Sequence, residues 1–292
     1  MLNVNSRLGP TSFLTFCALL MSASSGIAQA KIQDEPDFWQ KIDQGIFLAT
    51  PKIPSAFHPE IDPTIVILSV NPVYFNFEFY SASESKKGSP KTASTWANQK
   101  GLNIAVNAGM DEPDYRPTGY ARKGSKVFSP TPARNYSTRL LMGNSSFDIQ
   151  NSACTNANTG NRAMPGNAHT ELGIGSLQDC DGLPVEWKKA KSLRASMVVM
   201  GKLQTDTGEV LIAFSRAPRT MIEFQQNLQE LGFVFSNLVY LEGGPEASLS
   251  IRTQNLNRQW NGSFETGFVE NDKTSEQFRI PNIIGIRKLS HP

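Results

Sequence analysis

The sequence predicts an α+β fold, with a mixed, mainly antiparallel sheet, a few packed helices and a single domain. Many short runs rich in Ile, Val, Phe and Tyr alternate with Gly, Pro, Asn and Asp, which is typical of strands joined by turns. Two segments carry helix start and stop signals. This order favours helices packed on a sheet over regular β-α repeats.

The first half of the chain contains two pairs of predicted elements. Residues 37–47 predict a helical turn followed by a strand, and residues 64–80 predict two strands separated by an Asn-Pro pair. A short helix is expected over residues 92–98, because Gly101 can end it in a left-handed conformation. Residues 102–106 then form an apolar strand of the buried type.

The clearest local signals lie in the second half. Residues 196–204 and 209–215 flank an Asp-Thr-Gly turn and predict a hairpin. Residues 220–223 read Thr-Met-Ile-Glu, a capping box that starts an amphipathic helix, and Gly232 is its expected end. Further strands are expected at two apolar runs, residues 238–241 and 283–289.

Residues 144–180 are polar and show little apolar periodicity, so they predict an ordered excursion over the surface without regular structure. Cys154 and Cys180 are the two cysteines that remain after removal of a leader, and an even count in an exported protein favours a disulfide. Two free buried thiols are the alternative.

Residues 1–30 are interpreted as a signal peptide. Arg7 precedes the short apolar core of residues 12–21, and Ala28-Gln29-Ala30 fits a cleavage site. A retained membrane anchor is the alternative, but this core is short for a span. Lipid attachment at Cys17, as in a bacterial lipoprotein, is disfavoured because the bulky Phe16 precedes it, where a small residue is expected. We therefore expect a secreted or periplasmic protein with no transmembrane segment after cleavage, an N-terminal segment over residues 31–61 and a domain over residues 62–292.

Composition and missing motifs exclude several classes of function. The formal net charge is +2 and no lysine or arginine run is present, so nucleic acid and anionic membrane are poor candidate partners. No Gly-x-Ser-x-Gly elbow or phosphate-binding Gly-x-x-x-x-Gly-Lys loop occurs. The three histidines are scattered along the chain, so no zinc site and no cofactor are predicted. A divalent cation bound by Asp111, Glu112 and Asp114 is left as an alternative.

Two strand-like runs end in glycine turns that carry carboxylates. Residues 103–114 end in Asn-Ala-Gly-Met-Asp-Glu-Pro-Asp, and residues 237–249 contain Leu-Glu-Gly-Gly-Pro-Glu. Strands hold side chains rigidly at their ends, and glycine permits tight turns and close approach of a ligand. The pattern predicts one site at the ends of two strands.

These two turns resemble those of the phosphodiester glycosidase family. The Val-Asn-Ala-Gly-Met of residues 106–110, the Pro-Thr-Gly of residues 117–119, the hairpin at residues 206–208 and the Leu-Glu-Gly-Gly-Pro of residues 241–245 occur in the family's order, and Arg194 stands where the family usually has arginine. The family's aspartate is Glu242 here. The resemblance implies an exported hydrolase that cleaves the glycosidic bond of a sugar-1-phosphodiester in envelope or extracellular saccharide.

The resemblance and the chemistry of the reaction suggest roles for nine residues. The anomeric carbon becomes cationic, so a carboxylate beside it stabilises charge or activates water, and arginines bind the phosphate. Glu242 is the first choice for the carboxylate, and Asp111 and Asp114 are the second choices. The expected substrate-binding residues are Asn107, Gly109, Arg194, Gly243, Gly244 and Arg216.

Each assignment has a simpler structural alternative. Glu242 could cap a turn, Asp111 and Asp114 could mark a solvated proline turn, and the arginines could be surface residues. At the level of function, one alternative is a non-catalytic envelope protein that binds saccharide or a protein partner. The other is a phosphodiesterase that breaks the P–O bond.

Overall fold

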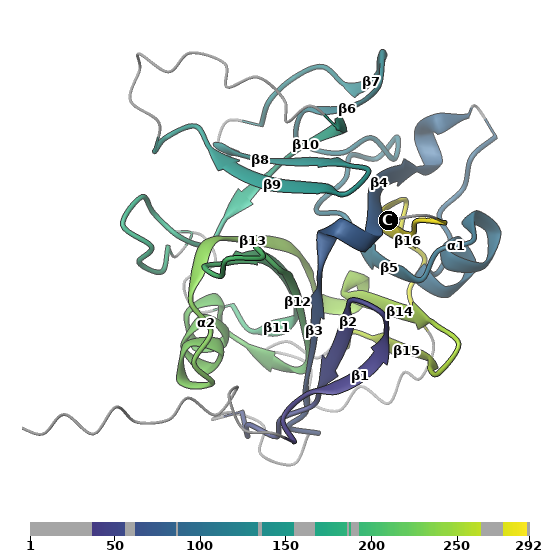
Figure 1. Cartoon of the computed structure of the whole chain (residues 1–292). Helices are drawn as coiled ribbons and strands as arrows, with labels where there is room; N and C mark the ends of the chain where they lie inside the picture. The colour runs from purple at the N-terminus through teal and green to yellow at the C-terminus, as the bar shows by residue number, and fades with distance from the viewer. Residues whose placement is uncertain are drawn as a thin grey trace, which may run out of the picture. The chain divides into compact units, whose positions relative to one another are not determined.

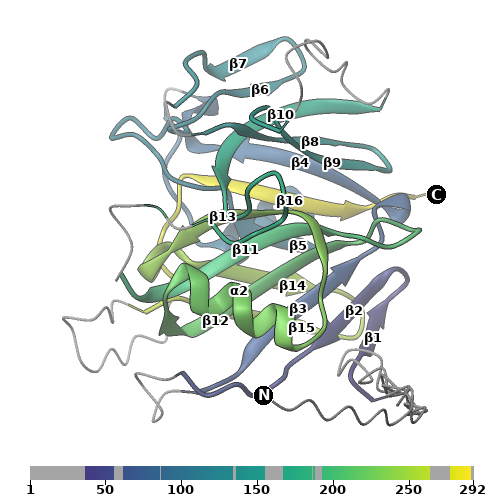
Figure 2. The same ribbon diagram turned by 90° about the vertical axis from the view of Figure 1, so that its left-hand side faces the viewer.

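Two antiparallel sheets share one hydrophobic core in the computed structural model (Figures 1 and 2). The chain divides into Met1–Ala30 and Lys31–Pro292, and all described residues belong to the second unit. The structure describes residues 37–55, 62–85, 87–133, 136–154, 167–185, 187, 193–263 and 277–290. The expected signal peptide, His58 and His291 lie outside the described residues.

The larger sheet has eleven strands. Nine follow the order β1-β2-β3-β12-β11-β13-β10-β6-β7, and β8 joins β10 to β9. Their bounds are Gln40–Asp43 (β1), Ile46–Ala49 (β2), Ile65–Val70 (β3), Ala121–Lys123 (β6), Lys126–Ser129 (β7), Thr138–Gly143 (β8), Ser146–Asn151 (β9), Ala168–Ser176 (β10), Ala195–Leu203 (β11), Val210–Arg219 (β12) and Phe235–Gly243 (β13).

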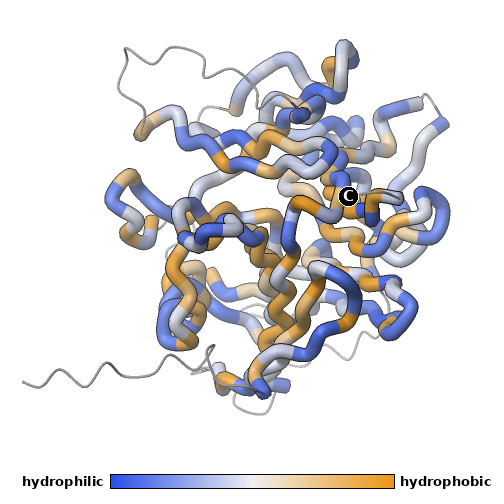
Figure 3. The backbone as a smooth tube through the Cα atoms, viewed as in Figure 1, coloured by the Kyte–Doolittle hydropathy of each residue, from blue (hydrophilic) through white to orange (hydrophobic). Residues whose placement is uncertain are grey.

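The smaller sheet has the order β15-β14-β5-β16-β4. Its strands are Phe75–Ser81 (β4), Ile104–Asn107 (β5), Ser248–Arg252 (β14), Asn257–Asn261 (β15) and Asn282–Lys288 (β16). The alternation in β4 shows how the sequence sets its faces: Phe75, Phe77 and Phe79 enter the shared core, while Tyr80 faces the opposite layer. Figure 3 shows hydrophobic residues along the strands and hydrophilic ones at the outer loops.

Two α-helices cover the outer faces of the described sheets. Helix α1 (Ala93–Lys100) packs Trp96 and Ala97 on the smaller sheet, starts at the Thr92 cap and ends at Gly101 with φ of 63°. Helix α2 (Met221–Glu230) packs Phe224 and Leu228 on the larger sheet, and Figure 2 shows the helix in front of that sheet. The predicted capping box of α2 is confirmed by both of its hydrogen bonds.

The predicted α+β class is wrong, because the described fold is mainly β, with two α-helices among sixteen strands. The strands that sequence reasoning missed are β6 to β10, β14 and β15. Residues 37–47 form the hairpin of β1 and β2 around Gly45, at φ of 72°, instead of a helical turn and strand. Residues 144–180 contain β9 and β10, so that segment is part of the sheet and not an irregular excursion.

The predicted disulfide between Cys154 and Cys180 is present, with a Cα–Cα distance of 5.0 Å. It links the segment after β9 to the turn after β10. No helix in the described part of the chain has the length and apolar character needed to cross a membrane. A disulfide is compatible with an oxidising, extracytoplasmic location.

Loss of this disulfide should destabilise the fold. A Cys154→Ser/Cys180→Ser double variant should unfold about 3 kcal/mol more easily, because the sequence separation of 26 residues defines a loop that becomes free in the unfolded chain. Denaturant titration measures the difference. A reductant should lower the midpoint of the unchanged protein and leave the double variant unaffected; equal midpoints without reductant would contradict the prediction.

Candidate active site

The two glycine turns predicted from the sequence meet at one end of the sheets. The side-chain oxygen of Asn107, at the end of β5, accepts a 3.0 Å hydrogen bond from the backbone N–H of Ser248, at the start of β14. Gly109 lies against the backbone of β13, since a Cβ added there would be 3.4 Å from the carbonyl oxygen of Leu241. Glu242 is the next residue after this contact.

Steric constraints explain why glycine occupies these turn positions. Gly109 and Gly244 have φ of 86° and 67°, in the left-handed region that favours glycine. Gly243 has an extended backbone, but a Cβ there would lie 2.2 Å from the Tyr240 hydroxyl and 2.9 Å from the Ser196 carbonyl oxygen. The structure therefore excludes a side chain at Gly243 and brings the Tyr240 hydroxyl beside the turn.

Three carboxyl groups gather at this point, and we call Asp111, Glu242 and Glu246 the acid cluster. Burial, together with the charges of Glu246 and Asp111 and against a hydrogen bond from the Gly243 N–H, raises the pKa of Glu242 to about 8. Burial and Asp111 raise the pKa of Glu246; burial and Glu112 raise that of Asp111. The mutual effects place the three carboxyl groups within range of one another's charge.

Two tyrosines stand near the acid cluster. Burial, followed by the charge of Glu242, raises the pKa of both Tyr136 and Tyr240, so both phenols remain protonated donors. The Tyr240 ring also packs edge-on against Trp187, with 5.3 Å between ring centroids. Aromatic rings beside carboxyl groups are suited to bind a sugar, whose C–H faces stack on rings while its hydroxyls find donors and acceptors.

A row of buried polar side chains crosses the end of the smaller sheet beside the acid cluster. We call Ser248, Asn107, Asn282 and Ser81 the polar row; each is at most 2% exposed. Asn282 pairs with Ser81, whereas Asn107 pairs with Ile283, so Asn107 and Asn282 lie at neighbouring positions on opposite faces of the sheet. Asn107 Nδ2, Ser248 Oγ and Asn282 Oδ1 have no hydrogen-bond partner among the described residues. Buried polar groups normally have partners, so these atoms mark a place for ligand or water.

The structure separates Asp114 from the other predicted acids. Its side chain is 57% exposed and forms an ion pair with Arg116, at 2.6 Å from the arginine Nε. This pairing lowers the pKa of Asp114. Asp114 lies at the tip of the loop of residues 110–118, whereas Asp111 lies at its base, bridged to Pro117. Asp111 is thus in the acid cluster, and Asp114 faces solvent.

The two predicted arginines have different surroundings. Arg194 directly precedes β11, whose Met197 and Val198 pair with Gly243 and Glu242, so it lies at the same end of the sheet. Arg216 donates from Nη1 to the carbonyl oxygens of Asn261 and Gly262, at 2.7 and 2.8 Å. Because a Cβ on Gly262 would lie 1.9 Å from the Gly244 carbonyl oxygen, Arg216 holds a segment directly against the glycine turn.

Sequence reasoning did not select Glu246, Tyr136 or Tyr240. Glu246 stands in the predicted turn, and its position three residues after Gly243 offered a signal that a second acid is nearby. Tyr240 is two residues before Glu242 on the same strand, which also brings it near the site. Tyr136 comes from a distant part of the chain, and no local pattern points to it.

Within the described ranges, no group of three or more His, Cys, Asp or Glu side chains has an arrangement that could hold a metal ion. The described part of the site contains carboxyl groups, phenols, an amide, hydroxyls, guanidinium groups and backbone N–H groups. Such groups can donate and accept protons and bind hydroxyls.

Comparison with solved structures supports the fold. A hypothetical protein from Synechocystis matches with a TM-score of 0.60 and 13% identity over 87% of this chain, which spans 64% of that protein. The catalytic domain of zebrafish N-acetylglucosamine-1-phosphodiester alpha-N-acetylglucosaminidase, auto-inhibited by its pro-peptide, matches with a TM-score of 0.53 and 9% identity over 89% of this chain and 87% of that domain. In sequence, the chain matches no family profile and no curated protein. The second likeness agrees with the fold implied by the resemblance.

Proposed function

We propose that the protein is an exported glycosidase that hydrolyses the bond between a sugar's anomeric carbon and a phosphodiester in envelope or extracellular saccharide. The observation that carries this proposal is the meeting of the Asn107-Gly109 turn and the Glu242-Gly244 turn around the acid cluster. The fold shared with a glycosidase catalytic domain supports it.

Glu242 acts as the proton donor in this proposal, in place of the base or charge stabiliser expected from the sequence. With a pKa of about 8, it is mostly protonated at neutral pH. A neutral carboxyl group can donate to an oxygen of the leaving phosphate, whereas a carboxylate would repel that anion. Carboxyl groups whose environments separate their protonation states commonly divide the acid and base roles.

Asp111 and Glu246 supply the negative charge that the reaction needs. The anomeric carbon is cationic in the transition state, and a nearby carboxylate stabilises it or activates the attacking water. The unpaired Asn107 Nδ2 donates to a sugar hydroxyl, and Tyr136 and Tyr240 provide further donors. Arg194 is positioned at the end of the sheet to bind the phosphate.

The proposal is tested with a panel of fluorogenic sugar-1-phosphodiesters, beginning with N-acetylglucosamine, in isotopically labelled water with and without chelator. Release of free sugar carrying the label supports it. Label in the phosphate would instead identify a phosphodiesterase, and saccharide binding without turnover across the panel would identify a non-catalytic binding protein. The chelator arm tests for a divalent cation.

The pH profile should be bell-shaped. Activity should fall as pH rises through about 8, because Glu242 then loses the proton it donates. It should also fall in acid, at a pH above the usual carboxyl pKa, because Asp111 and Glu246 both have raised pKa values and become neutral early. Steady-state kcat/KM from pH 4 to pH 10 measures both limbs; a rate that stays constant from pH 7 to pH 10 would contradict the acid role of Glu242.

A further inference from the structure

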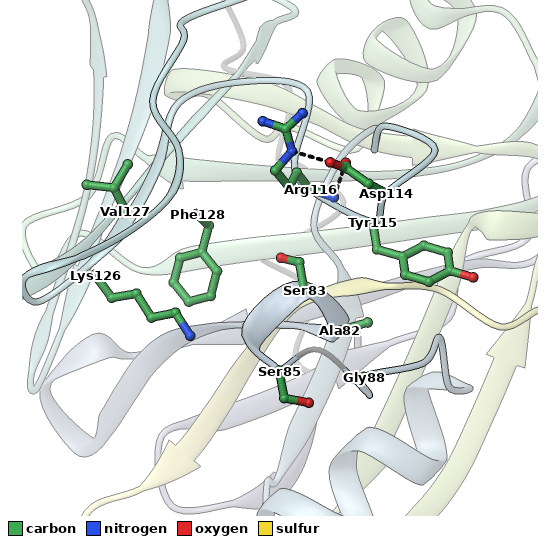
Figure 4. Close-up of a pocket in the computed structure, with 10 residues that line it drawn as sticks. All are labelled: Ala82, Ser83, Ser85, Gly88, Asp114, Tyr115, Arg116, Lys126, Val127 and Phe128. Atoms are coloured by element: carbon green, nitrogen blue, oxygen red, sulfur yellow. Dashed lines mark hydrogen bonds and ion pairs between the residues drawn. The ribbon is translucent and has the colours of Figure 1, made fainter.

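A pocket of about 440 Å³ lies on the far side of the loop that carries Asp111. It is formed by the tip of that loop, the short helix after β4 and the hairpin of β6 and β7. Figure 4 shows the Arg116–Asp114 pair on one side and Lys126 on the other, with Phe128 and Ser83 between them. The lining residues are Ala82, Ser83, Ser85, Gly88, Asp114, Tyr115, Arg116, Lys126, Val127 and Phe128.

The charged residues that line this pocket carry a net positive charge. They are Arg116, Lys126 and the acid Asp114. The Lys126 ammonium is held by the Glu84 carbonyl oxygen at 2.8 Å and lies 5.0 Å from the centroid of the Phe128 ring. Arg116 uses Nε for Asp114, and its two terminal nitrogens have no partner among the described residues.

The pocket and the glycine turn that carries Glu242 both lie next to residues of the polar row. Ser81, at one end of the row, directly precedes Ala82 and Ser83 of the pocket, and Ser248, at the other end, follows the glycine turn. The loop rests on this row, because the Tyr115 carbonyl oxygen accepts hydrogen bonds from Ser81 Oγ and Asn282 Nδ2. The three residues from Asp111 to Asp114 span at most about 11 Å.

We propose that this pocket binds a second, phosphate-bearing unit of a phosphodiester-linked saccharide chain, while the acid cluster holds the unit that is cleaved. The inference rests on the proposed function and narrows the substrate from a single sugar-1-phosphodiester to a polymer. Hydroxyls at Ser83 and Ser85 contact sugar oxygens, and Arg116 and Lys126 bind the phosphate.

Electrostatics explains why a second contact is needed. Three carboxyl groups at the point of cleavage weaken the binding of an anion, whereas Arg116 and Lys126 in the pocket attract the next phosphate along the chain. Binding energy from a remote part of a substrate can hold the reacting bond in an unfavourable field. A longer chain is therefore the better substrate.

The test measures binding without turnover. A labelled oligosaccharide of six sugar units joined by phosphodiesters is titrated into the full-length Glu242→Gln variant and followed by fluorescence anisotropy at low and high salt. Adding Arg116→Gln and Lys126→Gln should weaken binding at least tenfold and flatten its salt dependence. The matched control, Lys41→Gln with Arg258→Gln, removes the same charge from exposed positions on β1 and β15 and should change binding less than twofold.

Equal weakening by the control pair would overturn the inference, as would equally tight binding of a sulfated chain of the same length and charge. With Glu242 restored, the pocket variant should lower kcat/KM for phosphosaccharide oligomers while leaving that for a single sugar-1-phosphodiester unchanged. Turnover of single units without oligomer binding would overturn the pocket but not the proposed function. Oligomer binding without any turnover would reject the proposed function and retain the pocket.

Discussion

Glu242→Gln should lower kcat on a sugar-1-phosphodiester by roughly 10²–10⁴, the range expected for loss of a general acid. Gln has nearly the same shape as protonated Glu and can still accept the hydrogen bond from the Gly243 N–H, but it has no proton to transfer. Substrate affinity should change little. Initial rates on the purified mature protein measure the effect.

The same variant should become more stable than the unchanged protein in alkali. Because folding raises the pKa of Glu242 from 4.5 to about 8, the native state loses stability as pH rises between these values. The difference is on the order of 3–5 kcal/mol above pH 8, and Gln removes it. Thermal unfolding at pH 5 and pH 9 should show nearly equal midpoints at pH 5 and a higher midpoint for the variant at pH 9.

Asp114→Asn is the matched control. It replaces an exposed carboxylate on the loop that also carries Asp111, and its pairing with Arg116 lies outside the acid cluster. Turnover of a single sugar-1-phosphodiester should stay within about twofold of the unchanged protein, since exposed ion pairs contribute little. Normal turnover by Glu242→Gln, or its loss in Asp114→Asn, would reject the assignment of Glu242.

Local signals in the sequence predicted local structure well. The Thr220 capping box, Gly101 at the end of α1 and the strands on either side of the Asn-Pro pair were all predicted from residues a few positions apart, and all are confirmed. The disulfide also followed from counting cysteines. These features depend on short-range sterics and hydrogen bonds, which a single sequence contains.

The errors involve polar or glycine-containing strands, some in local hairpins (β6–β7, β8–β9 and β14–β15) and one, β10, with partners distant in sequence. On strand β10, Glu171 forms ion pairs with Arg122 and Arg139. The glycines of this strand leave room for other segments of the same protein: a Cβ on Gly175 would lie 2.2 Å from the Trp187 ring. Taken alone, polar residues and glycines of this kind are typical of a loop. Their place in a strand follows only from the pairing of that strand in the sheet. The α+β prediction failed because polar and glycine-rich strands were taken for irregular segments.

Only the part of the site that lies in the two glycine turns could be predicted, because those turns have local sequence signals. Asn107, Gly109 and Glu242 stand in turns with recognisable spacing, and the prediction that both turns form one site agrees with the contacts between them. Arg219 shows the limit. An arginine just before a helix start is ordinarily exposed, but the Arg219 side chain is fully buried, and Ser215, Asn227 and Ile53 surround it with acceptors.

Arg219→Met should therefore destabilise the protein by about 3–5 kcal/mol, the cost of breaking a buried, hydrogen-bonded charge site. Arg219 donates to Ser215 Oγ at 3.0 Å, to Asn227 Oδ1 at 2.7 Å and to the Ile53 carbonyl oxygen, and Glu223 lies 3.6 Å from its Nη1. Met fills much of the volume but leaves these acceptors without donors.

The consequence should be a loss of stability with little change in activity, although β12 also carries a residue at the site. Arg219 ends the strand that also carries Arg216, whose guanidinium holds Asn261 and Gly262 against the glycine turn. We expect the melting temperature to fall by roughly 10 °C, while kcat at 20 °C stays near normal because no acid-cluster residue changes. Arg258→Met, on the exposed edge strand β15, is the control and should shift stability by less than about 0.5 kcal/mol. Equal stability of the two variants would show that the buried guanidinium contributes no more to the fold than an exposed one.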